Sequence, residues 1–169
     1  KYLVMITIQI PVSLHVKKFL LSWYGEGYIL NLHDSLGKAV HGLLRKKINT
    51  VRGTLKMQEP YYTIHIPMSK AEKEGCVIHP NNLYLISEQF DKYFRDIAFS
   101  YVMIHSAIHN GQQKEGLREV LTAFNMTEDD ISLDSLYRDL KRKKSLPPYT
   151  NMFKDKFFME NEDSGEKNI

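Results

Sequence analysis

Cysteine is nearly absent from this chain, since Cys76 is the single cysteine among 169 residues. One thiol excludes an internal disulfide framework and is typical of a reducing compartment, so we expect a cytoplasmic location. The chain also lacks a run of about 18 consecutive apolar residues, which argues against a membrane-spanning helix and a membrane partner. Its length is nevertheless sufficient to bury one hydrophobic core without disulfides or metal ions.

Sequence motifs that indicate catalysis are missing as well. The glycines are dispersed and form no phosphate-binding loop, and Cys76 has no recognisable catalytic partners near it. His105 and His109 have the i, i+4 spacing with which two imidazoles share a metal ion, but no glutamate follows His105, so the metalloprotease signature is absent. We favour ordinary core or surface histidines, and predict neither a cofactor nor a bound metal.

Acidic residues are scarce in the first third of the chain. Residues 1–56 contain nine lysines and arginines but only two acidic residues, Glu26 and Asp34, which gives a net charge of +7. The whole chain carries +3, so everything after residue 56 sums to −4. This asymmetry indicates an anionic partner, with nucleic acid first, because neutralisation of phosphates by Lys and Arg dominates sequence-independent binding.

The longest periodic stretch predicts a single helix from about Asn82 to His109. Asn81 and Asn82 are suitable caps for its start, and Asn110-Gly111 is a strong stop signal. Because such a helix is far longer than average, we expect it to form the centre of the fold. Apolar residues recur at steps of three and four, and we expect one buried stripe of Leu83, Ile86, Phe90, Tyr93, Ile97, Tyr101, Ile104 and Ile108.

Alternating apolar residues predict two strands, over residues 2–10 and from Tyr62 to Ile66, and a short apolar run at Tyr28 predicts a third. Helices are expected between these strands, one after Ser13 and one after Asp34. The predicted class is therefore α+β, with a small mixed sheet of about three strands packed against helices, a long central helix and a carboxy-terminal helical hairpin.

The hairpin is predicted from helices over residues 114–125 and 130–144, which have the outline of a helix-turn-helix. Acidic residues from Glu128 to Asp130 occupy the positions that would read bases, so we favour an ordinary hairpin packed on the long helix. We expect one domain over residues 1–146, followed by a partly disordered tail over residues 147–169.

The candidate functional residues are basic. Arg45, Lys46 and Lys47 fall in the predicted last turn of the second helix, where cations complement the helix dipole, and this structural role is an alternative to ligand binding. If the fold gathers the basic residues on one face, with Tyr24, Tyr28 or Tyr61 nearby for stacking, a nucleic-acid surface results. The predicted set comprises Lys17, Lys18, Arg45, Lys46, Lys47, Arg52, Lys56, Lys141, Arg142, Lys143 and Lys144.

Our first hypothesis is a DNA-binding regulator or accessory protein, for example of a phage or mobile element, that uses its basic amino-terminal surface. The alternative is a structural or assembly protein that forms a homo-oligomer through the long helix and an aromatic tail containing Phe153, Phe157 and Phe158. An enzyme that uses His105 and His109 is the third hypothesis.

Overall fold

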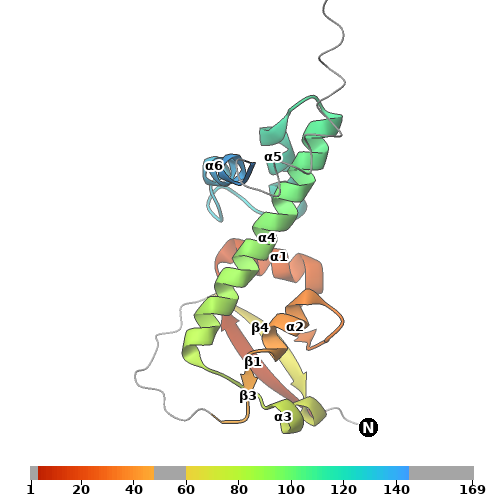
Figure 1. The fold of residues 1–169 in the computed structure, drawn as a ribbon, viewed down its shortest axis with the longest axis vertical. Helices are drawn as coiled ribbons and strands as arrows, with labels where there is room; N and C mark the ends of the chain where they lie inside the picture. The colour runs from red at the N-terminus through yellow and green to blue at the C-terminus, as the bar shows by residue number, and fades with distance from the viewer. Residues whose placement is uncertain (1–3, 48–59, 145–169) are drawn as a thin grey trace, which may run out of the picture. The chain divides into compact units, whose positions relative to one another are not determined.

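The computed structural model describes residues 4–47 and 60–144, and its mixed helices and strands confirm the predicted α+β class (Figure 1). The chain divides into two compact units, one over residues 1–96 and the other over residues 97–169. Among the described helices, none has the length and apolar character needed to cross a membrane. The predicted tail over residues 147–169 lies outside the described residues.

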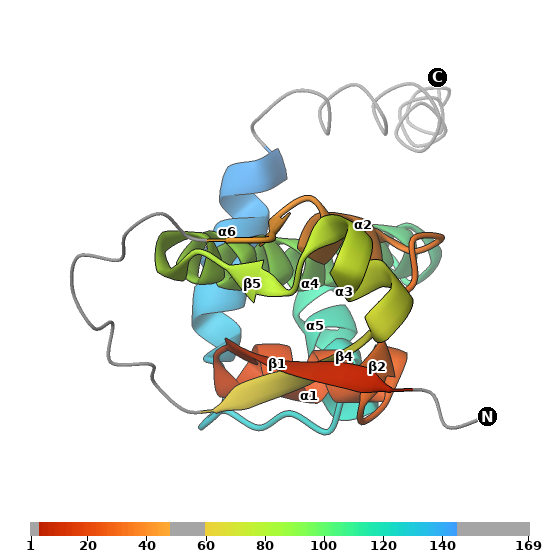
Figure 2. The ribbon, with the colours of Figure 1, turned by 90° about the horizontal axis from the view of Figure 1, so that it is seen from below.

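The first unit is built on a three-stranded mixed sheet with the order β1-β4-β2 (Figure 2). Strand β1 (Met5–Pro11) pairs antiparallel with β4 (Tyr61–Pro67), and β4 pairs parallel with β2 (Tyr28–Ile29). The alternation that predicted these strands sets their two faces, because successive side chains of a strand point to opposite sides. Ile64 and Ile66 are fully buried, whereas Thr7 and His65 lie opposite each other on the outer face.

Helix α1 (Leu14–Tyr24) follows Ser13, as predicted, and its C-cap is Gly25. Its apolar face buries Val16, Phe19 and Leu20 completely, whereas Trp23, one helical turn further on, is 52% exposed. Trp23 lies near the end of the helix, and its ring packs against the ring of Phe19 with centroids 5.8 Å apart.

Helix α1 packs on the first part of the long helix α4 (Pro80–Ile108) through aromatic and polar contacts. The rings of Phe19 and Phe94 have centroids 5.6 Å apart, and both side chains are buried. Beside them, the buried His15 donates from Nε2 to Oδ1 of Asp91 at 2.6 Å. Arg95 donates from Nε to the other carboxylate oxygen of Asp91 at 2.8 Å. The carboxylate therefore joins the two helices.

Helix α2 (Ser35–His41) is shorter than predicted. Asp34 caps its start by accepting the amide of Gly37 at 2.8 Å, but the helix ends before the basic residues that we placed in its last turn. The chain instead turns into a short strand, β3 (Leu44–Arg45), which pairs antiparallel with β5 (Val77–Ile78). Along the chain, helix α3 (Met68–Glu74) connects β4 to β5.

The long helix α4 has 29 residues and confirms the central element of the prediction. The amides of Asn82 and Leu83 donate to the carbonyl of His79, so the capping role predicted for Asn81 and Asn82 is wrong. Pro80 occupies the first helical position, where its missing amide is not required. Asn110 and Gly111 both have positive φ and end the helix as predicted.

The buried stripe of α4 differs from the predicted one in its second half. Ile86 and Phe90 are buried as expected, but the buried row then continues at steps of four, whereas Tyr101, Ile104 and Ile108 are 43%, 56% and 68% exposed. Each step of four residues exceeds the 3.6-residue turn, so the buried face winds around the helix. The row continues in steps of four as Phe94, Ala98 and Val102, and a last step of three leads to His105.

The second unit contains the end of α4 and the hairpin of α5 (Gln113–Ala123) and α6 (Leu133–Lys144). Both helices are amphipathic, and their buried side chains are Leu117, Val120, Leu121, Leu133, Leu136 and Leu140. This confirms the predicted carboxy-terminal helical hairpin.

Candidate nucleic-acid interface

The basic residues Arg45, Lys46 and Lys47 form what we call the basic corner of the first unit. Leu44 and Ile78, opposite each other in the ladder between β3 and β5, are buried, so the following residue on β3 points outward. All three residues of the basic corner are exposed. The corner therefore begins at the last residue of β3 and continues after it, and because α2 ends at His41 the helix-dipole explanation that we gave for these charges is wrong.

Gly75 holds the basic corner in place by close packing. A Cβ atom at this position would lie 2.2 Å from both the carbonyl carbon and the carbonyl oxygen of Arg45, a distance that real atoms do not reach. Gly75 also has φ 96° and ψ 175°, a conformation that is essentially restricted to glycine. The chain after α3 can therefore approach β3 only because residue 75 has no side chain. Sequence reasoning missed this role, for which the only signal was a glycine shortly before Val77 and Ile78.

Within the described residues, the guanidinium of Arg45 contacts main-chain carbonyls and no carboxylate. Its Nη1 donates to the main-chain carbonyls of Leu44 at 2.7 Å and Gly42 at 3.0 Å. Neutral carbonyls orient a guanidinium without neutralising it, so the positive charge remains available to an anion. Glu74, the last residue of α3, has its carboxylate oxygen Oε2 3.8 Å from Nε2 of His41.

The other predicted basic residues of the first unit do not join the corner through any described contact. Lys17 and Lys18 are half-buried on α1, and α1 and β3 lie apart in both views (Figures 1 and 2). Arg52 and Lys56 are outside the described residues. The structure thus brings together three consecutive members of the predicted set in this unit.

Two of the three tyrosines proposed for base stacking, Tyr24 and Tyr28, make contacts within the first unit. Tyr28 is buried, and its hydroxyl donates to the carboxylate of Asp34 at 2.8 Å. Burial, together with this hydrogen bond, raises the pKa of Tyr28 well above its usual range. Tyr24 packs edge-on against Tyr28 with ring centroids 5.3 Å apart, and Tyr61 is half-buried at the start of β4. Tyr28 thus helps to fix the cap of α2.

The second basic cluster, Lys141 to Lys144, lies in the last turn of α6, where the helix dipole favours cations. Several of its charges contact groups of their own unit. Arg142 donates to Asp139 at 2.7 Å, and Lys143 lies 5.0 Å from the ring centroid of Phe99. Partial burial lowers the pKa of Lys144. A structural role therefore accounts for this cluster better than for the basic corner.

The connection between α5 and α6 also argues against a helix-turn-helix. It runs from Phe124 to Ser132, whereas that motif has a turn of about three or four residues. Asp130 accepts the amide of Thr127 at 2.7 Å, and Glu128 accepts the amide of Leu133 at 3.0 Å. Both carboxylates therefore stabilise the turn, and α6 begins at Leu133 rather than at residue 130. The predicted ordinary hairpin fits these contacts.

His105 and His109 belong to a small polar cluster of the second unit. Their rings have centroids 4.4 Å apart, and Glu119 on α5 lies 3.4 Å from Nε2 of His105. Tyr101 donates to the same carboxylate oxygen at 2.6 Å, and this hydrogen bond lowers the pKa of Glu119. Within the described residues, no group of three or more His, Cys, Asp or Glu side chains is placed to hold a metal ion.

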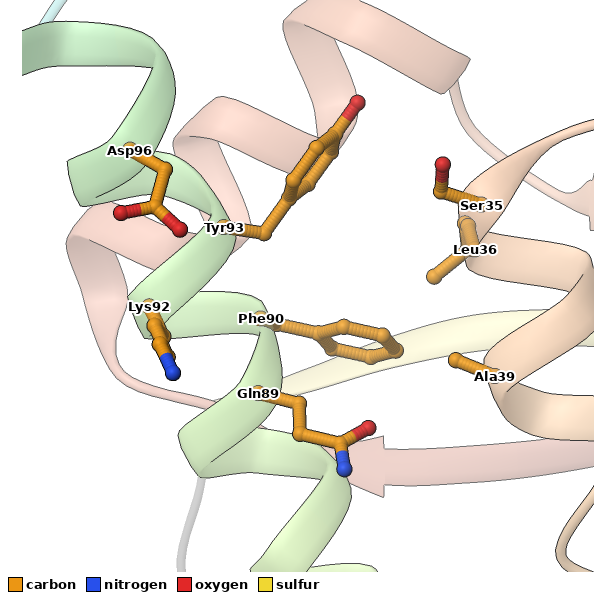
Figure 3. A pocket seen from close by; sticks show the side chains of 8 residues that line it. All are labelled: Ser35, Leu36, Ala39, Gln89, Phe90, Lys92, Tyr93 and Asp96. Carbon is orange, nitrogen blue, oxygen red and sulfur yellow. The ribbon is translucent and has the colours of Figure 1, made fainter. Parts of the chain in front are cut away.

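A shallow hollow of about 220 Å³ lies between α2 and the first part of α4 (Figure 3). Figure 3 shows the ring of Phe90 at its floor, with the side chains of Leu36 and Ala39 on the opposite wall. Its volume is below the roughly 300 Å³ at which ligand pockets usually begin. The hollow therefore adds no small-molecule site to the basic corner.

Comparison of the chain with protein-family models, with curated proteins and with solved structures gives no significant match.

Proposed function

We propose that this protein binds DNA and that the basic corner is the centre of its contact surface. The supporting observation is that Arg45, Lys46 and Lys47 are exposed at the end of β3 and just after it, outside any helix end that would account for them. Arg45 is oriented by main-chain carbonyls, and no carboxylate of the described residues is paired with it. A preoriented guanidinium followed by two lysines suits the phosphate backbone, because Arg binds phosphate oxygens in pairs and Lys acts as a point charge.

Binding of a fluorescent DNA duplex, measured by anisotropy as a function of salt, tests this proposal. We expect the wild-type affinity to fall steeply with salt, because bound lysines and arginines release counterions from DNA. Replacing Arg45, Lys46 and Lys47 with alanine should lower the salt slope by about 3, or about 1 for each phosphate contact.

A matched control removes three positive charges elsewhere. Lys38, Lys92 and Lys114 are exposed and lie outside the predicted set, so their replacement by alanine should leave most of the affinity and the slope unchanged. Equal losses in both triple variants would show that only net charge matters. An absence of wild-type binding at low salt would overturn the proposal.

A second candidate function is self-assembly through the long helix. Tyr101, Ile104 and Ile108 are exposed at steps of three and four, the spacing of a helix face that packs on another helix. The chain has no Lys, Arg, Asp or Glu between Ile97 and Gly111, so this part of α4 itself places no such charge on the face; the nearby carboxylate is that of Glu119 on α5, which accepts from Tyr101. We call these three side chains the apolar stripe of α4.

If the apolar stripe mediates assembly, replacing Ile104 and Ile108 with glutamate should abolish any concentration-dependent increase in mass, measured by light scattering. The two carboxylates would be buried without partners in the assembly, which is strongly unfavourable. The matched control places glutamate at the exposed polar positions Gln112 and Thr122. Assembly that survives the isoleucine variant, or a monomer at every concentration, would rule out this function for the stripe.

A further inference from the structure

Strand β1 has one edge that no strand of the described chain covers. It stands at the end of the order β1-β4-β2, with β4 on its other side. The carbonyl of Val4 accepts the amide of Met68, and the amide of Val12 donates to the carbonyl of Pro60. Because bonding alternates along an antiparallel strand, the even residues of β1 face β4. The amides and carbonyls of Met5, Thr7 and Gln9 therefore point outward from the free edge.

This edge lacks the features that usually protect edge strands from pairing. Natural proteins place lysines, other charged residues, bulges or prolines there, but β1 contains no charged residue, and its only proline is its last residue, Pro11. Its inward side chains are also incompletely covered. Ile6 and Ile8 are half-buried, whereas Ile64 and Ile66 of the neighbouring β4 are fully buried. Both main-chain hydrogen bonds and apolar surface therefore remain available at this edge.

We propose that β1 pairs antiparallel with β1 of a second copy of this chain, about a two-fold axis at Thr7. This register places Thr7 opposite Thr7 of the copy and Met5 opposite Gln9, and it uses the outward amides of all three residues. A register shifted toward Pro11 would lose one amide, because proline has none.

The same register accounts for the half-buried isoleucines and for the choice of partner. Ile6 of each copy lies opposite Ile8 of the other on the inner face, in the closer, non-hydrogen-bonded type of pair. Self-pairing of a charged strand would place like charges opposite each other, but β1 carries none. The sheet would thereby continue from one copy into the next, independently of the basic corner and of the apolar stripe.

Disulfide trapping tests the register in full-length protein carrying Cys76→Ser. Thr7→Cys should form a covalent dimer under mild oxidation, because Cα atoms of a hydrogen-bonded pair are about 5.5 Å apart, within disulfide range. Met5→Cys and Gln9→Cys should each remain largely uncrosslinked alone but should crosslink when mixed. Thr63→Cys is the matched control, since it lies on the same face but on the central strand β4.

Molar mass in solution provides a second measurement. Thr7→Lys places two ammonium groups opposite each other at the proposed axis and should weaken dimerisation at least tenfold, while Ile104→Glu with Ile108→Glu should leave it unchanged. Equal crosslinking at Thr7 and Thr63, or a folded wild-type protein that stays monomeric and yields no Thr7→Cys dimer, would overturn the pairing of β1. Dimerisation lost only in the isoleucine variant would also overturn it and would assign assembly to the apolar stripe.

Discussion

Replacing Gly75 with alanine is expected to lower the free energy of unfolding of the first unit by about 3 kcal/mol or more and to weaken DNA binding. Two costs combine at this position. The backbone has φ 96° and ψ 175°, which costs an L-residue about 1–3 kcal/mol. The new Cβ would also lie 2.2 Å from the main chain of Arg45, so β3 must move. The basic corner would move with it.

Gly25 provides a matched control for this substitution. Its φ of 80° and ψ of −179° are nearly those of Gly75, but nothing lies within 4 Å of an added Cβ. Gly25→Ala should therefore show the backbone cost alone, about 1–3 kcal/mol, with DNA affinity unchanged. The difference between the two variants isolates the crowding against Arg45.

Urea unfolding followed by the fluorescence of Trp23, the only tryptophan, reports the stability of this unit. Anisotropy titrations of the same two variants report DNA affinity. Equal stability losses at Gly75 and Gly25 would show that the close approach to Arg45 carries no energetic weight. A Gly75→Ala protein that is destabilised but binds DNA normally would separate the basic corner from binding.

Replacing Asp91 with alanine is expected to lower the free energy of unfolding by about 2–3 kcal/mol at neutral pH. The Asp91 carboxylate accepts from His15 at 2.6 Å and from Arg95 at 2.8 Å, and hydrogen bonds to charged groups contribute about 1.5–3 kcal/mol. Alanine would leave the buried His15 without this acceptor. Glu72, an exposed carboxylate on α3, is the matched control, and Glu72→Ala should change stability by less than about 0.5 kcal/mol.

The loss at Asp91 should depend on pH in a defined direction. Burial raises the pKa of this carboxyl, but hydrogen bonds from His15 and Arg95 outweigh burial, so the folded-state pKa lies below its usual value. The carboxylate therefore stabilises the fold above its unfolded pKa of about 3.9, and this contribution disappears as the pH falls through the folded pKa. The difference between wild type and Asp91→Ala should shrink in acid. A difference that stays constant between pH 7 and pH 2 would contradict this explanation.

The parts of the fold that depend on local pattern were predictable. Alternation at Ile6 to Ile10 and Tyr62 to Ile66 defines two strands whatever their partners are, because one face of each must be buried. The stop at Asn110-Gly111 likewise depends on residues that tolerate positive φ. These signals are contained within a few residues, and the structure confirms them.

The parts that depend on distant partners were not predictable from pattern alone. Leu44 continues the helical spacing of Leu36 and Val40. Leu44 and Arg45 nevertheless form a strand, because Ile78 and Val77 pair with them from far along the chain. The exposed side of α4 was also not predictable, because the spacing of apolar residues does not show where the buried face begins to wind around the helix. The sequence therefore shows Arg45, Lys46 and Lys47 as a basic run, but the position of Arg45 on a strand and the close packing of Gly75 against it required the structure.

The ladder between β3 and β5 links the basic corner to a segment that is distant in sequence, through two residue pairs only. Closing so long a loop costs chain entropy that few hydrogen bonds offset, so this ladder should form late in folding and open early. A polyanion that binds only the closed ladder would shift this local equilibrium by mass action. Nucleic acid would in that case act as a folding cofactor for its own binding site.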